Sequence, residues 1–172
     1  IRCAINPETG QELIYPTEPA AVRRNVWVVG GGPAGLTAAY EAARLGHKVT
    51  LFEKETEIGG QVRYAAQVPF KDAYGEWIRR LASKAVKLGA DIKTGTKVTD
   101  GMIIENKPDV VILATGGEEI IPPIDGIDLP QVVTALQVLG GEVAVGKNIV
   151  IIGAGLIGME TADYVVANGC QS

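Results

Sequence analysis

Residues 26–35 read Val-Trp-Val-Val-Gly-Gly-Gly-Pro-Ala-Gly, and this stretch decides the fold of the chain. The apolar run before the glycines predicts a buried β-strand. Pro33 stands where the first turn of a helix tolerates a missing N–H group, and apolar residues follow at helical spacing up to Gly46. A second apolar strand is expected over residues 47–53. We therefore expect strand, glycine turn, helix and strand in direct succession.

The glycines form a GxGxxG pattern, in which each has its own role. Gly30 makes the tight turn, Gly32 lets the backbone approach a diphosphate, and Gly35 lets the helix pack close to the strand. Glu53 ends the second strand, where a carboxylate can accept hydrogen bonds from ribose hydroxyls. The pattern predicts an α/β, Rossmann-like dinucleotide-binding domain with a parallel sheet.

Composition and charge limit the kinds of function that the chain can have. The 172 residues carry a net charge of −4 without a basic cluster, which argues against nucleic acid as a partner. The apolar runs are far shorter than the roughly 20 residues that span a bilayer, so no membrane is expected as a partner. The chain starts without Met or a hydrophobic leader, and we expect a cytoplasmic fragment of a longer protein. Cys3 and Cys170 lie far apart, which indicates neither a disulfide framework nor a dithiol redox centre.

Three regions follow from the pattern along the chain. Residues 1–24 form a proline-containing arm, residues 25–121 the dinucleotide-binding domain, and residues 122–172 a connector and the start of a second domain. Inside the first domain we expect a helix over residues 70–88 and a strand over residues 90–98. The β-branched run from residue 109 predicts a strand that is buried on both faces.

A second GxGxxG pattern begins at Gly153, after an expected strand over residues 149–152 and before a helix that runs to about residue 168. It predicts the first strand–helix unit of a second, truncated Rossmann domain, whose ribose-binding acid would lie beyond Ser172. NAD and NADP therefore stay undecided. Two dinucleotides together indicate hydride transfer from a nicotinamide to a flavin. No catalytic side chain is predicted, because the single histidine, His47, is expected at the surface.

The sequence Gly59-Gly60-Gln61 follows the second strand and leaves two interpretations open. The glycine pair lies on the same edge of the sheet as the first glycine turn, so it could close over the cofactor. It could equally be a plain loop.

Residues 28–36 together with Glu53 resemble the FAD-binding motif of two-dinucleotide flavoproteins, and Ala114-Thr115-Gly116 resembles their strand end near FAD. Residues 153–160 resemble their NAD(P)H-binding motif. The resemblance implies FAD contacts at Gly30, Gly32, Pro33, Ala34, Gly35, Glu53, Lys54, Gly60, Gln61, Val98, Ala114, Thr115 and Gly116. It implies NAD(P)H contacts at Gly153, Gly155, Ile157, Gly158 and Glu160.

The segment Arg2-Cys3-Ala4-Ile5-Asn6-Pro7-Glu8-Thr9-Gly10 resembles the junction before the flavoprotein module in 2,4-dienoyl-CoA reductase and related NADH:flavin oxidoreductases of the old yellow enzyme type. Residues 59–62 resemble the same family. The resemblance implies an upstream TIM barrel with FMN, and Cys3 as the last ligand of a [4Fe-4S] cluster.

The same resemblance implies a route for electrons in the parent protein. They would pass from NAD(P)H through FAD and the cluster to FMN, which would reduce an activated C=C bond of a small-molecule substrate such as a 2,4-dienoyl-CoA or an enoate. The barrel and the other cluster cysteines are missing here, so we expect this chain alone to bind neither FMN nor a cluster and to be inactive. A glutamate synthase small-subunit-like reductase and a non-catalytic flavin-binding module are the alternatives.

Overall fold

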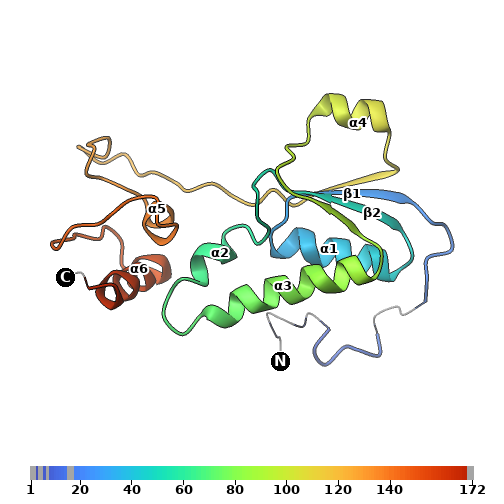
Figure 1. Cartoon of the computed structure of the whole chain (residues 1–172), viewed down its shortest axis with the longest axis horizontal. Helices are drawn as coiled ribbons and strands as arrows, with labels where there is room; N and C mark the ends of the chain where they lie inside the picture. The colour runs from blue at the N-terminus through green and yellow to red at the C-terminus, as the bar shows by residue number, and fades with distance from the viewer. Residues whose placement is uncertain (1–2, 4–5, 7, 15–17, 170–172) are drawn as a thin grey trace. The chain divides into compact units, whose positions relative to one another are not determined.

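A computed structural model describes residues 3, 6, 8–14 and 18–169 of the chain (Figure 1). The chain divides into two compact units, one formed by Ile1–Gly60 and Trp77–Gly116, the other by Gln61–Glu76 and Gly117–Ser172. The division thus falls after Gly116, whereas the sequence places the boundary after residue 121.

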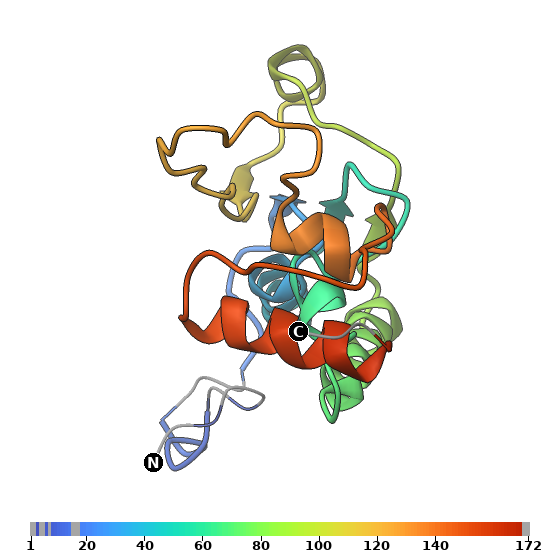
Figure 2. The ribbon, with the colours of Figure 1, turned by 90° about the vertical axis from the view of Figure 1, so that its left-hand side faces the viewer.

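The first unit is built on a parallel sheet with the strand order β3-β2-β1-β4. Its strands are β1 (Asn25–Val29), β2 (Lys48–Phe52), β3 (Asp91–Lys93) and β4 (Val110–Leu113). Helices α1 (Pro33–Arg44) and α3 (Asp72–Lys87) lie on one face of the sheet and α4 (Asp100–Asn106) on the other, as Figures 1 and 2 show. This confirms the α/β Rossmann-like fold with a parallel sheet.

The core of the first unit lies between the sheet and α1. Val28 and Leu51 of the strands and Leu36 of the helix are fully buried. The rings of Trp27 and Phe52 lie on the face of the strands opposite to Val28 and Leu51, with their centroids 4.6 Å apart and their planes tilted by 54°. Burial of one aliphatic side chain is worth about 1.5–3 kcal/mol, so buried residues such as Leu36 hold α1, and with it the glycine turn, on the sheet.

Two strands differ from the expectation. β3 is three residues long, Asp91–Lys93, instead of reaching residue 98. Gly95 has φ +64°, which bends the chain out of the extended conformation just beyond the strand. β4 is partly exposed, with Leu113 74% accessible, so the expected burial on both faces is wrong. The reason is its position, because β4 is an edge strand of this sheet.

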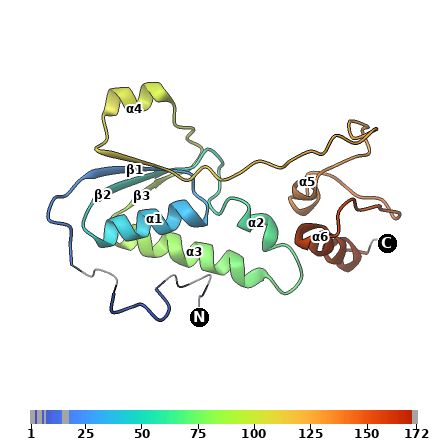
Figure 3. The same cartoon turned by 180° about the vertical axis from the view of Figure 1, so that it is seen from behind.

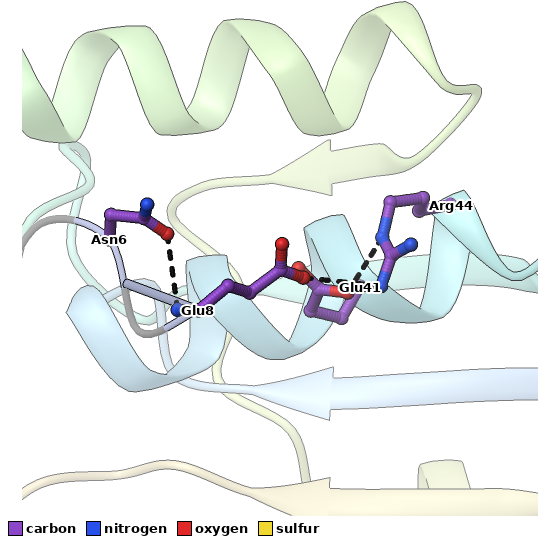
Figure 4. A network of polar contacts seen from close by, with 4 residues as sticks. All are labelled: Asn6, Glu8, Glu41 and Arg44. Atoms are coloured by element: carbon purple, nitrogen blue, oxygen red, sulfur yellow. Dashed lines mark hydrogen bonds and ion pairs between the residues drawn. The ribbon is translucent and has the colours of Figure 1, made fainter. Parts of the chain in front are cut away.

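The N-terminal arm has no helix or strand in its described residues, as predicted. It is fastened to α1 through a polar network (Figure 4), in which the Arg44 guanidinium lies 3.6 Å from the Glu8 carboxylate and donates hydrogen bonds to Glu41 at 2.6 and 2.8 Å. The Glu8 N–H donates to Asn6 Oδ1 at 3.1 Å. The hydrogen bond with Glu41, more than the surrounding charges, raises the pKa of Arg44. The guanidinium is therefore a permanent positive charge in this network.

The second unit contains α2 (Val62–Ala65), the beginning of α3, α5 (Ala135–Leu139) and α6 (Leu156–Ala167) (Figure 3). Thr134 caps α5 and forms the predicted capping box, since its Oγ1 accepts from the Gln137 N–H at 3.3 Å and Gln137 Oε1 accepts from the Thr134 N–H at 2.9 Å. Helix α6 ends at Ala167 with Gly169 at φ +87°, close to the expected end.

The strand expected over residues 149–152 is not formed. Val150 and Ile152 are instead 89% and 67% accessible. A strand needs a neighbour that pairs with its N–H and C=O groups. The described residues of the second unit contain no strand that could do so, which accounts for the difference. Among the described residues, no helix has both the length and the apolar character needed to cross a membrane.

Candidate dinucleotide-binding site

The first glycine turn leaves no room for side chains. Gly30 has φ +113°, and a Cβ atom added to it would lie 2.2 Å from the carbonyl oxygen of Ala114. A Cβ atom on Gly35 would lie 1.9 Å from the carbonyl oxygen of Gly30. Only glycine fits at either position, so the turn brings bare backbone to the beginning of α1.

The N-terminus of α1 has the properties of an anion-binding site. Gly32 is the N-cap and has no side chain to satisfy the first N–H groups. The first turn, which begins with Pro33 and Ala34, contains no acidic residue. Its partial positive charge is therefore not compensated from within the helix, as the binding of a diphosphate requires.

The Gly59-Gly60 loop lies against this turn. The Gly59 N–H donates to the carbonyl oxygen of Gly31 at 2.8 Å. Gly60 has φ +53°, and a Cβ atom on it would lie 3.2 Å from the Cα atom of Gly32. This close backbone contact favours closure over the glycine turn rather than a plain loop. Gln61 belongs to the second unit, where its side-chain amide donates to the carbonyl oxygen of Gly117 at 2.9 Å.

Glu53 is buried, with 7% of its surface accessible. Its Oε2 accepts a hydrogen bond from the Gly31 N–H at 2.7 Å, and its Oε1 accepts one from the Glu55 N–H at 2.9 Å. The carboxylate thus fixes the glycine turn, a structural role that the ribose interpretation did not include. Each carboxylate oxygen can accept a further hydrogen bond, so both roles are compatible. Lys54 is exposed and lies 3.7 Å from the Glu55 carboxylate.

The remaining predicted residues of the first site follow strands β3 and β4. The Ala114 N–H donates to the carbonyl oxygen of Val29 at 2.8 Å, which places Ala114 beside the glycine turn. The exposed residues Thr115 and Gly116 follow it. Val98 is half-buried and stands two residues after Thr96, whose N–H donates to the carbonyl oxygen of Glu53 at 2.8 Å. All of them lie at the carboxyl edge of the sheet, where open α/β sheets bind ligands.

The second glycine turn has the same backbone geometry as the first. Gly153 has φ +110°, and a Cβ atom on Gly158 would lie 1.9 Å from the carbonyl oxygen of Gly153. Gly155 caps α6 with φ −77° and ψ −177°, against −75° and −177° for Gly32. The first turn of α6, which includes the exposed Ile157, likewise contains no acidic residue. Both turns therefore fit a nucleotide diphosphate on the same structural grounds.

Two predicted residues have surroundings that the sequence did not indicate. Glu160, on α6, forms an ion pair with Lys71, which directly precedes α3. Cys3 is exposed. Among the described residues, no group of three or more metal-binding side chains comes together, so Cys3 lies in no cluster site within that part of the chain.

Residues 24–172 match the family described as pyridine nucleotide-disulphide oxidoreductase. The chain belongs to this family. It is 40% identical over 177 residues to an NADH oxidase of Thermoanaerobacter brockii and 39% identical over 171 residues to a bilirubin reductase of Mediterraneibacter gnavus. Each alignment covers 99% of this chain and 27% of the relative.

A solved structure of a 2-naphthoyl-CoA reductase in complex with 2-naphthoyl-CoA matches with a TM-score of 0.93 and 38% identity, over 98% of this chain and 26% of that one. The chain thus spans about a quarter of the length of each of these three proteins. Family membership identifies an oxidoreductase module and implies FAD and NAD(P)H as its dinucleotides. The two glycine turns fit the diphosphates of both groups.

Proposed function

We propose that this chain is the electron-entry module of a larger NAD(P)H-dependent flavin oxidoreductase, with FAD at the first glycine turn and NAD(P)H at the second. The observation that carries the proposal is the matched backbone of the two turns, each at the N-terminus of a helix without an acidic first turn. Two sites of one kind in one chain fit a reaction between two dinucleotides.

The residues at the first turn would bind FAD through their backbone. The N–H groups around Pro33 and Ala34 would face the diphosphate, and Glu53 would accept from the ribose while it holds Gly31. Residues 114–116 and Val98 would line the other side. At the second turn, Gly153, Gly155 and Gly158 would admit the diphosphate of NAD(P)H.

When bound, the nicotinamide supplies a hydride and the flavin accepts it. The part of this chain is to bind and orient both, and no side chain is assigned to proton transfer. Turns held by backbone contacts suit this task, because a donor and an acceptor of hydride must be fixed close together.

For the whole protein we propose the reduction of an activated C=C bond in a small molecule, such as an enoate or a 2,4-dienoyl-CoA, by a cytoplasmic enzyme. The similarity to a 2-naphthoyl-CoA reductase and a bilirubin reductase supports a reductase of unsaturated compounds. We further propose an FMN-bearing TIM barrel before residue 1 and Cys3 as one ligand of a [4Fe-4S] cluster. Cys3 alone does not make such a site, so the other ligands would come from outside this sequence.

The proposal is tested by reducing the flavin of the full-length protein with NADH under anaerobic conditions. The wild type should bleach at its visible absorbance. Gly153→Ala should keep its FAD and bleach with dithionite but not with NADH, whereas Gly30→Ala should lose FAD. A flavin-loaded wild type that neither NADH nor NADPH bleaches would support the non-catalytic flavin module instead.

The protein sequence upstream of residue 1 separates the two reductases. A barrel with three further cysteines supports the old yellow enzyme type. A small iron–sulfur domain in its place supports the glutamate synthase small-subunit type and would overturn the proposed substrate class.

A further inference from the structure

The ion pair between Lys71 and Glu160 joins two segments of the second unit that are far apart in the sequence. Lys71 lies in the loop between α2 and α3, and Figures 1 and 3 show this loop beside α6. The two side chains are only 29% and 28% accessible. The pair is thus partly shielded from water, so the attraction between its two charges is stronger than in an exposed pair.

The backbone around Lys71 is fixed independently of the ion pair. Phe70 has φ +65°, an unfavourable conformation for an aromatic residue, although its side chain is 97% exposed and gains nothing from packing. Buried Val68 anchors the loop on one side, and its carbonyl oxygen accepts from the Lys71 N–H at 3.1 Å. On the other side the Tyr74 N–H donates to the carbonyl oxygen of Lys71 at 2.9 Å. The loop therefore holds the lysine in a defined place.

Glu160 stands five residues after the N-cap Gly155, about 7.5 Å along the helix axis at 1.5 Å per residue. A dinucleotide diphosphate carries two negative charges at the same end of the helix. A bare carboxylate at this distance repels that diphosphate, since the Debye length at physiological salt is about 8 Å. A cation beside Glu160 would cancel this repulsion.

We propose that Lys71 is a positioning residue that neutralises Glu160 and so keeps the beginning of α6 open to the diphosphate of NAD(P)H. This inference rests on the proposed function of the second glycine turn. It assigns Glu160 to the ion pair and places the control of NAD(P)H affinity in the loop between α2 and α3, outside the GxGxxG pattern.

The test measures the Kd of NADH and of ADP-ribose for the full-length, FAD-loaded protein at about 50 mM salt. Lys71→Gln should raise both by about fivefold or more, because Glu160 is then uncompensated. Lys71→Arg should bind like the wild type, and Glu160→Gln as tightly or more tightly. The double variant Lys71→Gln/Glu160→Gln should return to within about twofold of the wild type, because neither charge remains.

Lys93→Gln is the matched control, since Lys93 also lies near a carboxylate, 3.7 Å from Asp91, but in the first unit. It should leave both Kd values unchanged. The difference between Lys71→Gln and the wild type should shrink at about 0.5 M salt, where screening is strong; a merely structural defect would persist there.

The inference is overturned if Lys71→Gln binds NADH like the wild type, if the double variant stays as weak as Lys71→Gln, or if Glu160→Gln alone weakens binding. The Kd of Glu160→Gln tests the inference even if Lys71→Gln does not fold. Failure of the proposed function is distinct, because then the wild type itself binds none of NADH, NADPH and ADP-ribose.

Discussion

Replacement of Gly35 by alanine tests directly whether the first turn depends on bare backbone. The new Cβ atom would lie 1.9 Å from the carbonyl oxygen of Gly30 and 3.0 Å from its carbonyl carbon. Relief requires the turn and the start of α1 to separate by more than about 1 Å, and overpacking of this kind costs about 1–3 kcal/mol. Alanine in a helix gains up to about 1 kcal/mol over glycine, and with this full gain a net loss of up to about 2 kcal/mol is expected.

Gly101→Ala is the matched control, because Gly101 also lies in the first turn of a helix, α4, where an added Cβ atom meets only Thr99 Oγ1 at 3.8 Å. This variant should be as stable as the wild type or up to about 1 kcal/mol more stable. Thermal unfolding followed by circular dichroism gives both values. Titration with FAD should show at least about tenfold weaker binding for Gly35→Ala only. Equal midpoints for the two variants, with unchanged FAD affinity, would refute the reasoning.

Three further predictions concern other contacts. Glu53→Gln should destabilise the protein by about 1.5–3 kcal/mol and weaken FAD binding, because the charged acceptor of the Gly31 N–H is lost. Urea unfolding measures the stability and titration measures the FAD affinity. Unchanged stability would contradict this prediction. Thr134→Ala should cost about 1 kcal/mol and speed amide exchange in α5, and an unaltered exchange rate would contradict the capping box. Arg44→Gln should release the arm and speed its cleavage in limited proteolysis by a few-fold. Because the pKa of Arg44 is raised, its contribution is present throughout neutral pH and lost only on strong alkalinisation, so the ratio of cleavage rates should stay constant between about pH 6 and 9.

The sequence predicted what depends on local patterns. The strand before Gly30, the helix that begins at Pro33 and the capping box at Thr134 are all encoded within a few residues, and each is present. The prediction of a strand over residues 149–152 was wrong, because an apolar run becomes a strand only when a neighbouring strand pairs with it. The exposure of Leu113 could not be predicted for the same reason, since it depends on where β4 lies in the sheet.

The site shows the same limit. Glycine spacing located both turns, but nothing near Glu53 in the sequence indicates that its carboxylate accepts from the Gly31 N–H, a residue 22 positions away. The Lys71–Glu160 pair joins residues 89 positions apart. Neither lysine nor glutamate spacing carries a signal over such a separation, so this ion pair could not be predicted from the sequence.

Comparison of the two turns shows where their geometry comes from. An added Cβ atom on Gly30 meets Ala114, beside the sheet, whereas one on Gly153 has nothing within 4 Å. Even so, a Cβ atom added to the third glycine of each pattern would lie at the same 1.9 Å from the carbonyl oxygen of the first glycine. The second turn therefore has this geometry although no strand is formed over residues 149–152. It follows that Gly30→Ala meets both a clash and a strained φ, whereas Gly153→Ala meets the strained φ alone, so the first substitution should be the more damaging to stability.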